Sequence, residues 1–190
     1  MVNNESSAEL MALISSWHDQ LTLWAGSGHL LQAAQTALKL PDDHPGLRAF
    51  VALIAAGDFT DLPPIIPLDW DAMEGSPGAY APDRRLILIN VEWLETALDE
   101  QVHAVLTEQL GHHLDVLFNP EDTPGDEGEL FLECLRGRTQ SEATITLFQA
   151  EEAHGVVHLD GEQVDVDEAG VGAICLDLRD LTHPSDQPKP

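Results

Sequence analysis

The residues best suited to chemistry lie together in the string Thr-Glu-Gln-Leu-Gly-His-His-Leu-Asp, residues 107–115. This string differs at two positions from H-E-x-x-H, in which two His one helical turn apart bind Zn²⁺ and the Glu activates a water. Glu108 stands at the first ligand position, where a carboxylate can still bind zinc, and His112 keeps the second. Gln109 replaces the general base, and an amide cannot accept a proton near neutral pH. The string therefore predicts a metal site that lacks its usual base.

Asp115 extends this pattern, because Glu108, His112 and Asp115 recur at i, i+4 and i+7 and so share one helix face. Two ligands one turn apart on one face can chelate one ion. Gln109 lies beside this pair, where it can orient a water, and Asp115 is a candidate for the base that Gln109 cannot be. The alternative is a polar helix face exposed to solvent, which the spacing alone favours.

A second group of acids follows in the string Gly-Asp-Glu-Gly-Glu, residues 125–129. It begins another predicted helix, and a carboxylate near a helix N-terminus is stabilised by the helix dipole. We expect Glu127 to be the third metal ligand, with Asp126 and Glu129 as substitutes. An acidic helix start with no further role is the equally weighted alternative. The same loop is a weaker candidate for Ca²⁺, without the regular spacing of an EF-hand, through Glu121, Asp122, Asp126 and Glu129.

Hydrophobic periodicity predicts the elements that must position these residues. Helices are expected over 7–40 with a break at 26–28, and over 46–56, 99–118, 126–135 and about 139–152. A strand is expected over Leu86–Asn90, and a hairpin over 154–167, where Asp-Gly favours a turn that matches strand twist. Residues 171–178 form a last strand or helix. The fold class is therefore α+β, mainly helical, with a small antiparallel sheet and a C-terminal β-hairpin.

Composition limits the partners of this chain. It has 190 residues, 43% of them hydrophobic, and a net charge of −26. Such a charge repels nucleic acid and anionic lipid, so we expect neither as a partner and no membrane insertion. It suits a cationic partner or a calcium-rich exterior. Trp17, Trp24 and Trp70 are expected in the core, and Cys134 and Cys175 as buried thiols in preference to a disulfide.

Four strings in this order carry a family resemblance: Gly-Asp-Phe-Thr-Asp-Leu-Pro at 57–63, Gly-Ala-Tyr-Ala at 78–81, Glu-Gln-Leu-Gly-His at 108–112 and Asp-Thr-Pro-Gly-Asp-Glu-Gly-Glu-Leu-Phe at 122–131. They resemble a zincin-like, gluzincin-type metallopeptidase-like domain of large bacterial RTX or hemolysin-like surface proteins. The resemblance covers roughly residues 50–168. It implies a zincin-like fold with a zinc peptidase site, whose third ligand comes from the acidic helix.

The resemblance also implies that strand Leu86–Asn90 lies at the edge of the sheet, where it pairs with an extended peptide. The chain departs from the family's Glu-Glu-x-Gly-His at Gln109. We divide the chain into an N-terminal helical region at 1–57, a zincin-like domain at 58–178 that includes the hairpin, and a disordered tail at 183–190.

Three functions remain open. The first is a zinc-dependent metallopeptidase-like enzyme, weak or inactive because of Gln109. The second is a non-catalytic zincin-like module, or pseudoenzyme, that binds a protein or peptide segment. The third is an acidic inhibitor or decoy, suggested by charge alone. No signal peptide opens the sequence, so we expect a soluble protein, cytoplasmic or exported by another route, and the sequence does not indicate its oligomeric state.

Overall fold

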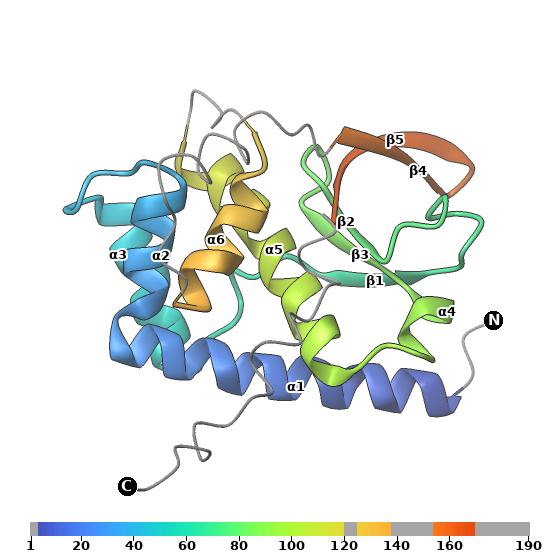
Figure 1. Ribbon diagram of the computed structural model, residues 1–190, viewed down its shortest axis with the longest axis horizontal. Coiled ribbons are helices and arrows are strands. Elements are labelled where there is room, and N and C mark those ends of the chain that lie inside the picture. The colour runs from blue at the N-terminus through green and yellow to red at the C-terminus, as the bar shows by residue number, and fades with distance from the viewer. Residues whose placement is uncertain (1–3, 120–124, 138–153, 170–190) are drawn as a thin grey trace, which may run out of the picture.

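Three helices at the start of the chain pack together: the first runs along the lower edge of the molecule in Figure 1, and the other two lie over one end of it. They are α1 (Asn4–Ser27), α2 (His29–Ala37) and α3 (Pro45–Ala55). Gly28 adopts a φ of 83°, which allows the chain to turn directly from α1 into α2. His44 caps α3, because its Nδ1 accepts a hydrogen bond from the backbone N–H of Leu47 at 3.1 Å. The computed structural model describes residues 4–119, 125–137 and 154–169.

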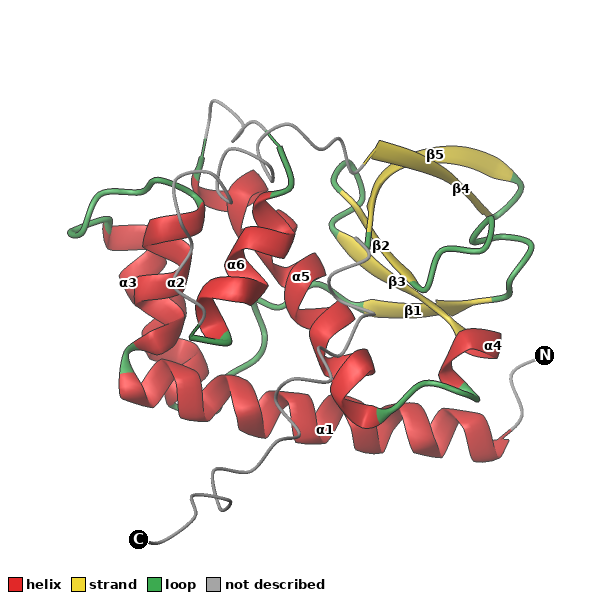
Figure 2. Cartoon of the chain, viewed as in Figure 1, coloured by secondary structure: helices red, strands yellow, loops and turns green. Residues whose placement is uncertain are grey.

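The three remaining described helices are α4 (Val91–Leu94), α5 (Asp99–Phe118) and α6 (Glu127–Leu135). Of these, α5 lies at the centre of the molecule, between the sheet and the other helices (Figure 2). A buried hydrogen bond from the indole Nε1 of Trp17 to the hydroxyl of Thr107, at 3.0 Å, joins α1 to α5. The helices α1–α3 therefore contribute to the same hydrophobic core as α5 and α6.

One five-stranded sheet, in the order β1-β3-β2-β5-β4, lies beside α5. Its strands are β1 (Ile65–Leu68), β2 (Gly78–Ala81), β3 (Leu86–Asn90), β4 (His154–Leu159) and β5 (Glu162–Glu168). The expectation of an antiparallel sheet is wrong for one pair: β1–β3 is parallel and the other pairs are antiparallel, so the sheet is mixed. The expectation that Leu86–Asn90 forms an edge strand is wrong, because β3 is paired on both sides. The hairpin β4–β5 joins the sheet through β2.

Side chains of the sheet alternate between two buried clusters, as the two-residue period of a strand requires. Tyr80, Ile87 and Ile89 face the large helical core. Ala79, Ala81 and Leu88 face a smaller cluster that the hairpin and Met73 close on the other side. Both faces of β2 and β3 are thus buried, and the two strands pack directly against α5.

The α+β, mainly helical fold class is confirmed. Two strands, β1 and β2, were not predicted, and Trp70 is 49% exposed rather than in the core. The expectations for 139–152, 171–178, Cys175 and the tail lie outside the described residues. Among the described helices, none is both long and apolar enough to cross a bilayer.

Candidate metal centre

Residues 104–115 of α5 are all buried, so the helix is enclosed on every side along this stretch. Glu108 and Gln109 are fully buried, and His112 and Asp115 are 1% and 2% exposed. The alternative of a polar face exposed to solvent is therefore wrong. Charged and amide groups rarely lie in a core unless a partner or an ion compensates their lost hydration, so their burial needs a chemical explanation.

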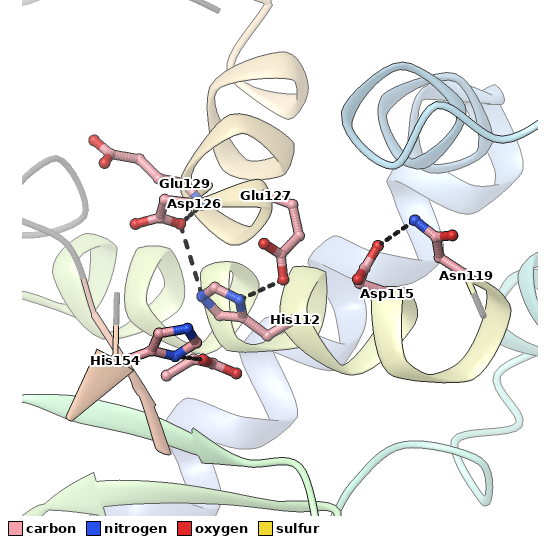
Figure 3. A network of polar contacts seen from close by, with 8 residues as sticks. His112, Asp115, Asn119, Asp126, Glu127, Glu129 and His154 are labelled. Carbon is pink, nitrogen blue, oxygen red and sulfur yellow. Dashed lines mark hydrogen bonds and ion pairs between the residues drawn. The ribbon is translucent and has the colours of Figure 1, made fainter. Parts of the chain in front are cut away.

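The N-terminus of α6 brings acidic groups to this face of α5 (Figure 3). Glu108, His112 and Asp126 each offer a ligand atom, and these atoms lie within 4.8 Å of one another. Asp126 is the residue before α6 begins, and its Oδ1 accepts a hydrogen bond from the backbone N–H of Glu129 at 2.7 Å. That cap fixes the carboxylate 3.7 Å from His112 Nε2. A carboxylate–imidazole–carboxylate set is a suitable donor set for zinc.

Glu127, the expected third ligand, contacts His112 from the other side of the ring. Its Oε1 lies 2.8 Å from His112 Nδ1, while Asp126 lies next to Nε2 (Figure 3). With the Nδ1 proton donated to Glu127, Nε2 is the ring nitrogen that lies next to Asp126 and is left for a metal ion. This is the way in which an outer carboxylate orients a metal-binding imidazole. Of the three acids offered by the sequence, Asp126 thus lies in the ligand group and Glu127 in the supporting position.

Two glycines allow α5 and α6 to approach closely enough to form this group. A Cβ on Gly128 would lie 2.5 Å from His112 Nε2 and 2.7 Å from the backbone oxygen of Glu108. A Cβ on Gly111 would lie 2.7 Å from the Cα of Gly128. Any side chain at either position would force the helices apart and separate Asp126 from α5.

The charges around His112 favour a cation at this place. Burial alone would lower the pKa of His112, but the hydrogen bond and charge of Glu127, together with the charges of Asp126 and Asp167, raise it to about 10. Burial raises the pKa of Glu127, against the opposing effect of His112. In the absence of metal the shared proton therefore lies on His112, and a metal ion at Nε2 must displace a proton from the ring.

Buried polar atoms of Gln109 and His112 show whether this site suits a metal ion. Neither amide atom of Gln109, nor Nε2 of His112, has a hydrogen-bond partner among the described residues, although all three atoms are buried. Buried polar groups in native proteins are normally satisfied by protein, water or an ion. A metal ion at Nε2, with a ligand within reach of Gln109, would satisfy this requirement, so the residues present fit the expected metal.

Asp115 and Glu129 take no part in the ligand group. The Oδ1 of Asp115 accepts a hydrogen bond from Asn119 Nδ2 at 3.1 Å, and the side chain points toward the next turn of α5 (Figure 3). The carboxylate of Glu129 points away from His112 (Figure 3). The candidate calcium loop is described only at Asp126 and Glu129, because residues 120–124 lie outside the described chain.

Sequence reasoning did not place the hairpin near this centre. Asp167 on β5 adds to the negative charge at His112, and its Oδ1 lies 3.1 Å from Nδ1 of His154 on β4. The side chain of His154 is 76% exposed. The hairpin therefore contributes a His–Asp pair to the surroundings of the candidate metal centre, which no sequence spacing could have shown.

His113, the next residue along α5, contacts Tyr80 and Asp61 in place of the candidate metal ligands. Its Nδ1 lies 2.8 Å from the hydroxyl of Tyr80, and its Nε2 lies 3.4 Å from the backbone oxygen of Asp61. Burial lowers the pKa of His113 to about 4. The ring is therefore neutral, with Nε2–H donating to Asp61 and Nδ1 accepting from Tyr80.

Comparison of the chain with protein-family models, with curated proteins and with solved structures found no match in any of the three. The interpretation of this centre therefore depends on its own geometry and chemistry.

Proposed function

We propose that this protein binds one divalent metal ion, with zinc best matched, between α5 and α6 in a zincin-like centre that does not hydrolyse its ligand. The observation that supports this most strongly is the buried group Glu108, His112 and Asp126, whose ligand atoms lie within 4.8 Å of one another. One imidazole and two carboxylates suit Zn²⁺, whereas Ca²⁺ takes six to eight oxygen ligands. The orientation of His112 by Glu127 strengthens the zinc assignment.

A bound zinc ion would supply Lewis-acid polarisation of a water or carbonyl oxygen. The residues around the ion determine whether that polarisation leads to hydrolysis. Gln109 can donate or accept a hydrogen bond, and so can orient a ligand, but it cannot remove a proton. Asp115, the other candidate base, is engaged by Asn119. The centre therefore binds and positions a ligand without the proton transfer that hydrolysis needs.

An extended protein or peptide segment is the ligand that we propose for this centre. The strand β4 lies at the end of the sheet and pairs only with β5 among the described strands. Its far end is covered, because the backbone N–H of His158 donates to the oxygen of Ala72 at 2.8 Å. Its first residues, beginning with His154, have no such cover from the described residues. A partner strand could add there by backbone hydrogen bonds.

The metal content of the purified protein tests the proposal. We expect about one equivalent of zinc per chain, lost in His112→Ala, and no cleavage of a broad peptide library by the unmodified protein. Replacement of Gln109 by Glu restores the base, so Gln109→Glu should gain zinc-dependent cleavage. Absence of zinc from the unmodified protein, with no binding on titration, would contradict the metal assignment.

Slow hydrolysis is a second candidate function, and the His154–Asp167 pair favours it. An imidazole held by a carboxylate is a common general base, and Asp167 is close enough to influence His112. This candidate predicts chelator-sensitive cleavage by the unmodified protein that is lost in His154→Ala. The first candidate predicts no cleavage in either protein, so one assay separates the two.

A further inference from the structure

A pocket of about 480 Å³ lies between α3, the loop before β1 and the end of α5. None of its described lining residues belongs to the metal centre. Most of its wall is apolar, and is formed by Ala49, Phe50, Leu53, Leu62, Leu117 and Phe118. Its volume lies within the range typical of small-molecule sites. The pocket therefore has the size and the apolar wall that a small ligand needs.

His113 lines this pocket. Both nitrogens of its ring are engaged, one by the hydroxyl of Tyr80 and the other by the backbone oxygen of Asp61. The hydrogen bond to Asp61 also holds the loop before β1 in place. Among the described residues that line the pocket, Arg85 and Asp61 carry a full charge.

Arg85 and Asp61 carry opposite charges, line the same pocket and are both exposed. Neither takes part in an ion pair within the part of the chain that the structure describes. The neighbouring Arg84, by contrast, is paired with Glu162 at 2.7 Å. Arg85 also has a φ of 52°, which is uncommon for a residue other than Gly, Asn or Asp.

We propose that this pocket binds a small zwitterion with apolar side chains, of the class of apolar dipeptides. The ligand's carboxylate pairs with Arg85, its ammonium group pairs with Asp61, and its side chains pack against the apolar wall. A guanidinium matches a carboxylate in geometry as well as in charge. A fatty acid or another simple anion fits less well, because Asp61 and the net charge of −26 both repel it. A zwitterion has no net charge and avoids this long-range repulsion.

The ligand series that tests this inference removes one charge at a time. The probes are the dipeptide Leu-Phe, its N-acetyl derivative and its C-terminal amide, measured by isothermal titration calorimetry. We expect Leu-Phe to bind, and each blocked form to bind about fivefold to tenfold more weakly, because each loses a charged hydrogen-bonding partner. The affinities should be equal with zinc and with chelator, since the pocket is separate from the metal centre. Loss of dipeptide binding would therefore contradict the pocket proposal alone, and loss of zinc binding would contradict the metal assignment alone.

Variants of the pocket then link each ligand charge to one residue. The variant Arg85→Gln should bind Leu-Phe and the C-terminal amide of Leu-Phe with the same affinity. The matched control Arg84→Gln should prefer Leu-Phe over the amide, as the unmodified protein does. Asp61→Asn should lose the preference for the free ammonium group and keep the backbone oxygen that holds His113. These outcomes would assign the two charges individually.

A filling variant tests the location. Ala49 and Ala52 are both exposed on α3, but only Ala49 lines the pocket. Ala49→Trp should abolish binding, and Ala52→Trp should leave it unchanged. The inference is overturned if Leu-Phe does not bind, if the blocked forms bind equally well, or if Arg84→Gln and Arg85→Gln have the same effect.

Discussion

A single methyl group on Gly128 should disrupt the metal centre. The Cβ of an alanine there would lie 2.5 Å from His112 Nε2 and 2.7 Å from the backbone oxygen of Glu108. The imidazole is buried and held by Glu127, and the backbone oxygen belongs to a buried helix, so neither can turn aside. The start of α6 must therefore move away from α5, and Asp126 moves with it.

The expected cost combines two opposing effects. Gly→Ala inside a helix normally gains about 0.5–1 kcal/mol, because glycine loses more backbone entropy on folding. Forcing an extra carbon into a packed core costs about 1–3 kcal/mol, and backbone shifts raise that figure. We therefore expect Gly128→Ala to lower the free energy of unfolding by about 1–2 kcal/mol without metal, and to weaken zinc binding in addition.

Urea unfolding, with chelator and with zinc, measures both effects. The unmodified protein should gain stability on adding zinc, while Gly128→Ala should start lower and gain less. Gly26→Ala on α1 is the matched control, because its Cβ would meet nothing within 4 Å, and it should be as stable as the unmodified protein or slightly more so. If Gly128→Ala has unchanged stability and an unchanged zinc response, the close approach of α5 and α6 does not form the centre.

Three further predictions concern the residues around the centre. Thr107→Val should cost about 1–3 kcal/mol in urea unfolding, because it leaves the buried Trp17 N–H without its acceptor; Thr107→Ser should cost less. The difference in free energy of unfolding between the unmodified protein and His113→Gln should be constant above pH 6.5, and the unmodified protein should lose up to about 3 kcal/mol relative to the variant as the pH falls toward 4. The reason is that burial lowers the pKa of His113 to about 4, so the unfolded chain binds the proton more tightly than the folded one. A difference that does not change with pH would contradict this. In zinc titrations Glu127→Gln should lower the zinc affinity about 10- to 100-fold, and Asp126→Asn should lower it further. The reverse order would make Glu127 the ligand.

The helices and the hairpin could be predicted because local signals define them. Asn119-Pro120 marks the end of α5, and Asp126 is a strong N-cap for α6. The hairpin turn places Asp160 and Gly161 at φ of 54° and 82°, values that Asp-Gly adopts readily.

The two missed strands depend on tertiary contacts instead. The prolines before and within β1 suggest irregular chain, but Pro67 is tolerated because β1 lies at the edge of the sheet. Gly78 and the alanines of β2 have low strand propensity. Their small size is required by packing, since a Cβ on Gly78 would collide with Val105 on α5.

The candidate site was predictable in its helices and residue types, but not in the role of each acid. The spacing of Glu108 and His112 on one face follows from helix geometry. The choice between Asp126 and Glu127 depends on the angle and distance at which α6 crosses α5, which Gly111 and Gly128 set. The position of Asp167 depends on pairing between β5 and β2, two strands far apart in sequence.

Zinc K-edge X-ray absorption of the protein loaded with one equivalent of zinc identifies the atoms that bind the ion. We expect one imidazole nitrogen and carboxylate oxygens at about 2.0–2.2 Å, with no sulfur, and loss of this signal in His112→Ala. A sulfur ligand, two or more imidazoles, or an unchanged spectrum in His112→Ala would contradict a centre formed by Glu108, His112 and Asp126.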